Sequence, residues 1–451
     1  MKKIKYYTAL YSAKISSLGL KMLGKRVPYY PGVIAQRVDS DFIVNSSKPP
    51  LIIGVTGTNG KTTVSTMLCD FFKSVGKKVV SNNGYNLDTG VAASLVKNTN
   101  IFGKLNGDVW IIEIDERDSD DIFSKVDFDY LLVTNLFRDS MKRNAHVEFI
   151  LNLIKKNISK KTRLILNADD IISSSLNQYD NAAYYSISKL STDKDKQESR
   201  ICDVHYCPRC GKELVFDYVR YHHIGKIHCS SCDFKNNDAQ YTAKINFKAN
   251  SITINNDKYE LLTNSVFNAY NFLSVVSLLS ELNYTYDQIK ESFNGITVDT
   301  SRWDETVING IKLNCILAKG QNSIACSTVF KYVKEESDDK IVLLMLDDVE
   351  DNIESTETVS WVYDADFEFL NDEKIKEIIV GGVRCHDYKL RLLLAGVPED
   401  KIKVTDSEYD MPALIDFKKA NHVYLLFEIF ALEQSRKVKD GIVKRMSELN
   451  D

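Results

Sequence analysis

Proline, long apolar runs and an excess of either charge are all scarce in this sequence of 451 residues. With 7 Pro and 20 Gly, the chain is neither collagen-like nor a low-complexity disordered polymer. No run of about 18 apolar residues occurs, so a membrane-spanning helix is not expected. Lys and Arg number 58 and Asp and Glu 62, and the resulting charge of −4 argues against a nucleic-acid coat protein, which needs a basic surface.

Apolar residues and cysteines are present in quantity. Hydrophobic residues make up 44% of the chain, enough to bury the cores of about three domains at this length. The nine cysteines are an odd number, and four of them form two CxxC pairs. This pattern is typical of a metal site in a reducing compartment rather than of a disulfide framework, so we expect a cytoplasmic protein.

The first 30 residues combine lysines with tyrosine, leucine, isoleucine and methionine. Lys14 interrupts the apolar run and no small-residue cleavage site follows, which disfavours a secretory signal. We favour an amphipathic helix packed on the rest of the protein and place an N-terminal helical segment at residues 1–45. A basic amphipathic helix can also rest on anionic lipid, so peripheral contact with the inner face of the membrane stays a minor alternative.

From about residue 50, short apolar runs alternate with stretches of helical spacing. Strands are predicted at 51–55, 109–112, 130–133 and 163–166, with helices at 62–73 and 266–282. Further strands are predicted at 312–317, 341–346, 375–380 and 423–427. Alternating strands and helices imply mostly parallel sheets with right-handed crossovers. We therefore expect a first α/β domain at 46–304 and a second, Rossmann-like α/β domain at 305–451.

A glycine-rich segment between the first predicted strand and helix predicts a phosphate-binding loop. It reads Thr56-Gly57-Thr58-Asn59-Gly60-Lys61-Thr62-Thr63. Glycines let backbone amides approach phosphate oxygens, and the start of the helix adds unpaired amides and a positive dipole end. Lys61 can reach the β- and γ-phosphates, and the Thr62 hydroxyl can bind Mg²⁺. The strict P-loop pattern fails at one position, since Val55 stands where its first glycine belongs.

This segment is similar to the ATP loop of the Mur ligase superfamily, whose members activate a carboxylate as an acyl phosphate and then form an amide. Further motifs of that superfamily follow in order: Glu113 after a strand, Thr134-Asn135-Leu136, Leu166-Asn167-Ala168-Asp169-Asp170, Phe267-Asn268-Ala269-Tyr270-Asn271 and Arg302. The resemblance implies that ATP is bound by Gly57, Thr58, Asn59, Gly60, Lys61, Thr62, Thr63, Asn268, Asn271 and Arg302. It also implies that Thr62 and Glu113 hold Mg²⁺, and that Lys61, Glu113 and Arg302 serve catalysis.

The two CxxC pairs predict a zinc ribbon. They are Cys207-Pro208-Arg209-Cys210 and Cys229-Ser230-Ser231-Cys232, and the spacing between them is typical of such modules. Four cysteine ligands close the coordination shell, so the zinc is expected to be structural. We place the ribbon at residues 200–245, inserted in the first domain. Because four cysteines suffice, the nearby histidines are expected to be solvated loop residues: His205, His222, His223 and His228.

A zinc ribbon within a Mur-type ATPase resembles the MurT family, the ligase subunits of lipid II isoglutaminyl synthases. Residues 360–368, 381–384 and 390–392 resemble segments of that family's second domain. The resemblance implies a role in peptidoglycan biosynthesis, with a lipid II-type muropeptide as substrate and a GatD-like glutamine amidotransferase as partner in a heterodimer. The chain would phosphorylate the D-glutamate α-carboxylate of the stem peptide, and ammonia from the partner would attack the acyl phosphate.

Departures from the family pattern leave alternatives open. Thr358 stands where the family carries an Asp that is lent to the partner's Cys–His pair, and a hydroxyl does not hold an imidazolium as a carboxylate does. One alternative is therefore a divergent ligase that acts on another carboxylate, with altered or lost glutaminase coupling. Another is a scaffold that binds nucleotide without chemistry. Nucleic-acid binding by the ribbon is disfavoured, because acidic residues offset Arg209, Arg220 and Lys226.

Overall fold

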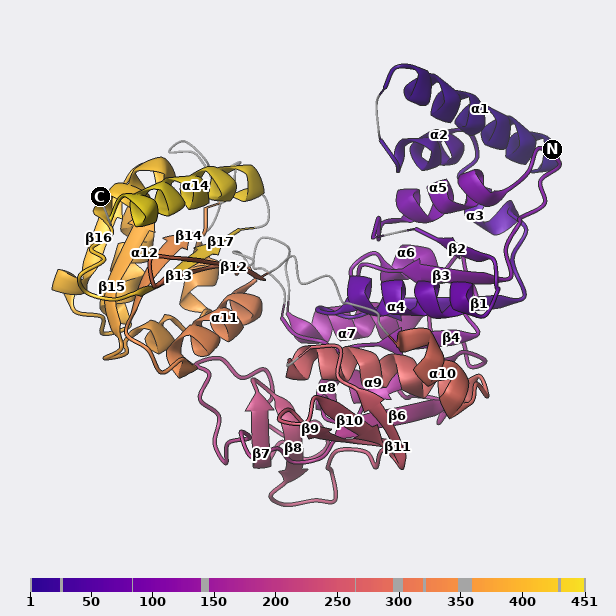
Figure 1. Cartoon of the computed structure of the whole chain (residues 1–451). Coiled ribbons are helices and arrows are strands. Elements are labelled where there is room, and N and C mark those ends of the chain that lie inside the picture. The colour runs from indigo at the N-terminus through magenta and orange to yellow at the C-terminus, as the bar shows by residue number, and fades with distance from the viewer. Residues whose placement is uncertain are drawn as a thin grey trace. The chain divides into compact units, whose positions relative to one another are not determined.

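The computed structural model describes residues 2–24, 27–82, 84–138, 146–263, 265–294, 303–318, 322–347, 359–428 and 431–449. The chain forms two compact units, each with its own large sheet (Figure 1). The first comprises Met1–Phe137, Val147–Lys196 and Val204–Val298; the second comprises Arg138–His146, Gln197–Asp203 and Asp299–Asp451. The second unit thus includes three segments of the range expected for the first domain: Arg138–His146, Gln197–Asp203 and residues 299–304.

The first unit is built on a mostly parallel sheet, which has nine strands within the described residues. Their order is β11-β10-β9-β6-β5-β4-β1-β3-β2, and β10 and β11 are antiparallel at one edge. The strands are β1 (Leu51–Thr56), β2 (Val79–Ser81), β3 (Val109–Glu113), β4 (Tyr130–Val133), β5 (Arg163–Asn167), β6 (Ala182–Ile187), β9 (Tyr241–Asn246), β10 (Ser251–Ile254) and β11 (Asp257–Glu260). The strands predicted at 51–55, 109–112, 130–133 and 163–166 are confirmed as β1, β3, β4 and β5.

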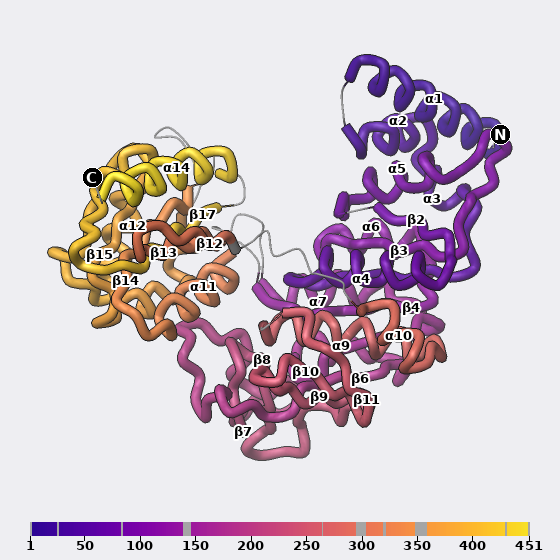
Figure 2. Tube along the Cα trace, viewed as in Figure 1, coloured from indigo at the N-terminus to yellow at the C-terminus, as the bar shows by residue number. Residues whose placement is uncertain are grey.

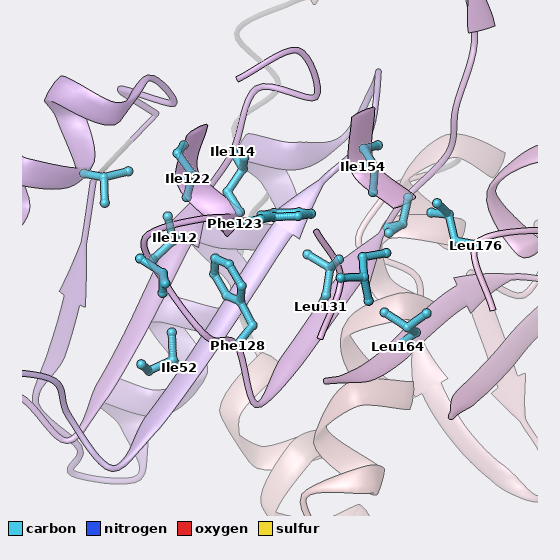
Figure 3. Packing of buried hydrophobic residues seen from close by; sticks show 14 of the residues in the cluster. Ile52, Ile112, Ile114, Ile122, Phe123, Phe128, Leu131, Ile154, Leu164 and Leu176 are labelled. Atoms are coloured by element: carbon cyan, nitrogen blue, oxygen red, sulfur yellow. The ribbon is translucent and has the colours of Figure 1, made fainter. Parts of the chain in front are cut away.

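The central strands are short apolar runs because helices cover the sheet on both faces. Every residue of β3 is buried. On one face, Ile112 of β3 and Leu131 of β4, the strands on either side of β1, pack with Phe123 and Phe128 in a single apolar cluster (Figure 3). Gly54 in β1 makes room for this packing, since a Cβ there would press on the side chains of Leu131 and Phe128.

The first three helices of the first unit follow each other closely in sequence and contact one another. They are α1 (Lys2–Met22), α2 (Tyr30–Val38) and α3 (Phe42–Asn45). They are followed by α4 (Lys61–Ser74), α5 (Asp88–Asn98), α6 (Ser119–Phe123), α7 (Val147–Lys156), α8 (Ile171–Ser174), α9 (Val266–Glu281) and α10 (Tyr286–Phe293). The helices predicted at 62–73 and 266–282 are confirmed as α4 and α9. These two helices, distant in sequence, lie side by side on the sheet (Figure 2).

A small hairpin is inserted between β6 and β9. Its strands, β7 (Leu214–Tyr221) and β8 (Ile224–Cys229), pair antiparallel and form a separate sheet. The turn between them places His222 at a φ of 46°. We refer to residues 204–236 as the four-cysteine module.

The second unit is also built of alternating strands and helices. Its sheet, as far as the structure describes it, has the order β12-β13-β17-β14-β15-β16, with β12 antiparallel and the other strands parallel. The strands are β12 (Trp303–Ile308), β13 (Ile311–Leu317), β14 (Lys340–Met345), β15 (Ile375–Gly381), β16 (Ile402–Thr405) and β17 (His422–Phe427). The helices are α11 (Ser323–Glu335), α12 (Cys385–Leu394), α13 (Met411–Leu414) and α14 (Leu432–Glu448), with short 3₁₀ turns η2 (Ser360–Tyr363), η3 (Phe367–Leu370), η4 (Glu399–Lys401) and η5 (Glu408–Asp410).

Candidate functional site

The predicted phosphate loop joins β1 to α4 and is shaped by two glycines. Gly57 has a φ of 128° and Gly60 a φ of 90°, a region that side chains other than glycine strongly disfavour. A Cβ on Gly57 would also collide with Thr134, and one on Gly60 with the Asn271 side chain. The loop therefore needs glycine at both positions, for backbone conformation and for close approach.

The Thr134-Asn135 motif after β4 holds this loop in place. Asn59 donates its backbone N–H to Asn135 Oδ1 at 3.0 Å, and the Asn59 carbonyl accepts from Thr134 Oγ1 at 2.7 Å. The backbone N–H of Thr58 donates to the Asn135 carbonyl at 2.9 Å. The motif thus fixes the loop conformation. The N–H groups in the first turn of α4, which includes Thr63, have no partner within the helix and point toward the loop.

Lys61 is held by the carboxylate of Glu116, which was not among the predicted site residues. Its Nζ lies 2.8 Å from Glu116 Oε2 and 2.5 Å from the Gly57 carbonyl oxygen. Burial opposes the charge of Lys61, but the carboxylates of Glu116, Asp115 and Glu113 outweigh it and raise the pKa of Lys61. Lys61 is therefore a fixed cation at the carboxyl end of β1, beside the phosphate loop. The available signal for Glu116 was its place in the acidic run that follows β3.

Thr62 and Glu113 meet as expected for a shared cation site. Thr62 Oγ1 donates to Glu113 Oε1 at 2.9 Å, and Glu113 is the last residue of β3, beside Val55 of β1. Asn82, after β2, braces Glu113 by accepting from its N–H at 2.9 Å and donating to its carbonyl at 2.7 Å. A hydroxyl and a carboxylate are the oxygen ligands that Mg²⁺ prefers, so the donor set fits this ion.

The start of α9, which carries the Phe267–Asn271 motif, reaches the phosphate loop. The Asn271 side chain lies against Gly60, and Asn271 Nδ2 donates to Asn268 Oδ1 at 3.4 Å. Asn268 in turn donates to Thr263 Oγ1 at 2.9 Å. The structure thus brings Asn268 and Asn271 together with the loop, whereas Arg302 and Thr358 lie outside the described residues.

The Asp169-Asp170 pair after β5 is buried and fully engaged. Asp170 caps α8 by accepting from the N–H groups of Ile172 and Ser173 at 2.9 and 3.1 Å, and its other oxygen accepts from Leu136 N–H at 2.7 Å. Asp169 Oδ2 accepts from the Tyr270 hydroxyl at 2.6 Å. Burial raises the pKa of Asp169, against the opposing pull of neighbouring groups.

The tip of the four-cysteine module inserts into this region. Arg220 at the end of β7 contacts Asp169 and Asp193 at 3.2 and 2.8 Å. Tyr221 packs on Phe267, just before Asn268, with ring centroids 4.4 Å apart. The tip of the hairpin therefore supports the N-terminus of α9, which carries the Phe267–Asn271 motif.

Two expectations for this module are wrong. His222 and His223 are buried rather than solvated, and His223 Nε2 lies 3.1 Å from Asp170 Oδ1. Arg220 is buried too and does not add to the surface charge. His205 is exposed, as expected, and His228 is half-buried. Histidine and arginine are typical of solvated loops, but tertiary packing here pairs His223 and Arg220 with buried carboxylates and places His222 against Phe137.

The four cysteines of the module converge. Cys207 Sγ lies 3.6 Å from Cys232 Sγ, and Cys210 Sγ lies 3.4 Å from Cys229 Sγ. Sulfurs around a tetrahedral zinc with bonds of about 2.3 Å are separated by about 3.8 Å. Gly211, with a φ of 71°, makes the turn that closes the first pair. The donor set and its spacing therefore fit a tetrahedral metal such as Zn²⁺.

In the second unit, the segment Leu390–Leu392, which resembles a segment of the MurT family, contains Arg391. Its side chain is buried and donates to the carbonyls of Val362 and Ala365, both at 2.9 Å. It also pairs with Glu368 at 2.7 Å. These contacts fix the η2–η3 segment, which contains Trp361 and follows the part of the chain that includes Thr358.

A parallel sheet with a Lys-Thr phosphate loop and a carboxylate beside it, followed by a second α/β domain, defines an ATP-dependent ligase of the Mur type. The family profile described as Mur ligase middle domain matches residues 55–279, and that described as MurT ligase C-terminal matches 319–431.

The relatives specify the family further. The chain is 30% identical over 421 residues to the lipid II isoglutaminyl synthase (glutamine-hydrolyzing) subunit MurT of Staphylococcus aureus (strain COL), covering 92% of this chain and 94% of the relative. It is 27% identical over 449 residues to the MurT subunit of Streptococcus pneumoniae (strain ATCC BAA-255 / R6), covering 96% and 97%. The chain belongs to the MurT family.

Solved structures share the fold at low identity. A pseudomurein peptide ligase type C from Methanothermus fervidus matches with a TM-score of 0.65 at 20% identity, over 89% of this chain and 81% of the other. MurF from Acinetobacter baumannii matches with a TM-score of 0.57 at 11% identity, over 91% and 80%. These likenesses extend the Mur ligase fold to both units.

Proposed function

We propose that this chain is the ATP-dependent ligase subunit of a lipid II isoglutaminyl synthase. It would activate the α-carboxylate of D-glutamate in the lipid II stem peptide for amidation by ammonia. The observation that carries the proposal is the approach of Thr62 to Glu113 at 2.9 Å beside the loop that positions Lys61. The MurT relatives are named as lipid II isoglutaminyl synthase subunits, and this supports the choice of substrate.

The chemistry follows from these groups. A carboxylate oxygen of D-glutamate attacks the γ-phosphorus of ATP and ADP leaves, which gives an acyl phosphate. Ammonia then attacks the acyl carbon, loses a proton and displaces inorganic phosphate, which gives D-isoglutamine, the α-amide of D-glutamate. Lys61 and the amides of the loop bind and orient the phosphates, and positioning of this kind supplies most of the rate enhancement in phosphoryl transfer. Mg²⁺, held by Thr62 and Glu113, would neutralise phosphate charge.

Arg302 is proposed as a further phosphate contact, on the resemblance alone. The four cysteines Cys207, Cys210, Cys229 and Cys232 are proposed to hold a structural Zn²⁺, with no vacant position for catalysis. The convergence of their sulfurs at 3.4 and 3.6 Å supports this assignment.

A GatD-like glutamine amidotransferase is the proposed source of ammonia, since the relatives are named as subunits of a glutamine-hydrolyzing synthase. Thr358 in place of a carboxylate favours the alternative, a ligase with altered or lost glutaminase coupling. In that case free ammonia would still support amidation. A Thr358→Asp variant that raises glutamine-dependent but not ammonia-dependent turnover would identify weakened coupling.

The proposal is tested by phosphate release and amide formation with a lipid II-type muropeptide. Turnover is expected to need ATP, the muropeptide and ammonia together. Lys61→Ala should abolish it and weaken ATP binding. Lys73→Ala, which changes an exposed lysine of the same helix, is the matched control and should keep wild-type turnover. ATP binding by Lys61→Ala equal to that of wild type would contradict the proposal.

A further inference from the structure

Helix α1 is apolar on two opposite faces. One of these faces packs on the rest of the first unit, and the other is exposed. Tyr6, Ala9, Leu10 and Ala13 are buried against the rest of the first unit. The opposite face carries a second apolar row at helical spacing: Ile4, Tyr11, Ile15, Leu18 and Met22. These five side chains are 44–77% exposed. A helix that needed only to pack on its own domain would carry polar residues on this face.

A turn beside α1 extends the same apolar surface. Tyr7 and Tyr11 of α1 donate their hydroxyls to the carbonyls of Phe102 and Ile101, at 3.0 and 2.9 Å. The turn is therefore tied to the helix by two hydrogen bonds. Its side chains point outward, with Ile101 58% and Phe102 78% exposed. Two large apolar side chains at the tip of an exposed turn, next to an apolar helix face, form a contiguous patch.

All the charged residues of α1 are basic. The helix contains five lysines (Lys2, Lys3, Lys5, Lys14 and Lys21) and neither Asp nor Glu, in a chain whose net charge is −4. On a helical wheel, Lys3 and Lys21 flank one side of the apolar row, and Lys5 flanks the other. Lys14 is not part of this surface, because its Nζ donates to the Val96 carbonyl at 2.9 Å. Lys97 and Lys104, near the turn, are exposed as well. We name Lys3, Lys5, Lys21, Lys97 and Lys104 together with the apolar row and the turn the α1 surface.

We propose that the α1 surface binds an anionic lipid bilayer, with the apolar row and Phe102 inserted at the level of the headgroups and the lysines against lipid phosphates. Apolar residues flanked by lysines match the interfacial helices that lie in a membrane plane. A second copy of this chain is a poorer occupant, because a symmetric contact would bring lysines against lysines. Among the described residues no helix is long and apolar enough to cross a membrane, so the contact would be peripheral.

Binding of the α1 surface to a bilayer deepens the proposed function, and the benefit of this binding to the enzyme rests on that function. The substrate of the proposed reaction is lipid-linked, so an enzyme held at the bilayer surface meets it at a high local concentration. The bilayer contact itself does not depend on the reaction, and the two can fail separately.

The test is flotation of the full-length chain with vesicles that contain no lipid II. Vesicles of phosphatidylcholine with an equal part of phosphatidylglycerol should carry the protein, vesicles of phosphatidylcholine alone much less, and high salt should weaken binding. Ile15→Glu and Phe102→Glu should each weaken binding by about tenfold, since each places a charge among the inserted apolar groups. Replacing Lys3 and Lys21 by alanine should weaken binding to the anionic vesicles by about fivefold per lysine.

Leu394→Glu is the matched control, because it introduces the same charge at a side chain 62% exposed in the second unit. Equal flotation of wild type, Ile15→Glu and Leu394→Glu would overturn the inference. So would a wild-type dimer that Ile15→Glu converts to monomer, since a second copy would then cover the surface. Amidation of a soluble muropeptide by Ile15→Glu at the wild-type rate, together with lost flotation, would separate this contact from the proposed chemistry.

Discussion

Arg220 Nη1 lies 3.2 Å from Asp169 Oδ2, and both side chains are almost completely buried. The pair joins the inserted hairpin to the motif that follows β5. Burial works against the charge of Arg220, but Tyr270, Asp193 and Asp169 outweigh it and raise its pKa, so the guanidinium is charged. The four-cysteine module is thus linked to the Asp169-Asp170 motif after β5 by a buried ionic network.

Arg220→Met should destabilise the first unit strongly. The substitution leaves Asp169 and Asp193 buried without their shared cation, and removing one partner of a buried ion pair costs about 3–5 kcal/mol. Urea unfolding measures the loss. Arg209→Met is the control: Arg209 pairs with Asp233 on the surface, and loss of such a pair costs at most about 1 kcal/mol. Equal effects of the two substitutions would show that the network contributes no more than a surface pair.

Removal of the metal proposed for the four-cysteine module should weaken ATP binding. Without the metal, the two CxxC pairs are no longer linked to each other, and Tyr221 and Arg220 lose the support that holds them against α9. A thiol-reactive reagent that releases zinc should therefore raise the dissociation constant for ATP in proportion to the zinc released, at constant excess Mg²⁺. The measurements are zinc release with a chromogenic chelator and nucleotide binding by calorimetry. Full zinc release with unchanged affinity for ATP would contradict this coupling.

The sequence predicted the parts of the site that lie close together along the chain. The loop from Gly57 to Lys61 follows from glycines between an apolar strand and a helix, and both elements are where the spacing put them. Glu116 and Arg220 were missed because their roles depend on pairing across 55 and 51 residues of sequence, with Lys61 and Asp169. Burial of this kind is decided by tertiary packing, and hydrophobic periodicity carries no information on it.

Glu116→Gln should strengthen the binding of ATP in the absence of Mg²⁺. The glutamine amide keeps the shape of the side chain but removes a negative charge next to the phosphates and releases Lys61 from its ion pair at 2.8 Å. We expect the dissociation constant for metal-free ATP to fall by about tenfold, the equivalent of one weak charge–charge contact. Asp70→Asn, on the outer face of α4, is the control and should leave the affinity unchanged. Weaker binding by Glu116→Gln would mean that Glu116 positions Lys61 rather than competes for it.

His422 should make the stability of the second unit depend on pH. Asn314 Nδ2 donates to His422 Nε2 at 2.9 Å, which requires this nitrogen to be unprotonated, and the imidazole stacks on Tyr424. Burial, together with Lys312, lowers the pKa of His422 against the opposing pull of nearby carboxylates, Asp338 first among them. The unfolded chain therefore binds this proton more readily than the folded chain does.

The stabilising contribution of neutral His422 is thus complete above the unfolded pKa of about 6.5 and is lost as the pH falls from there toward the folded pKa, by at most about 1.4 kcal/mol per pH unit. Urea unfolding at a series of pH values should show this slope in wild type. His422→Gln keeps an acceptor for Asn314 but does not titrate, so its free energy of unfolding should fall less steeply below about pH 6.5. Parallel slopes for the two proteins would show that His422 gains its proton equally in the folded and unfolded states.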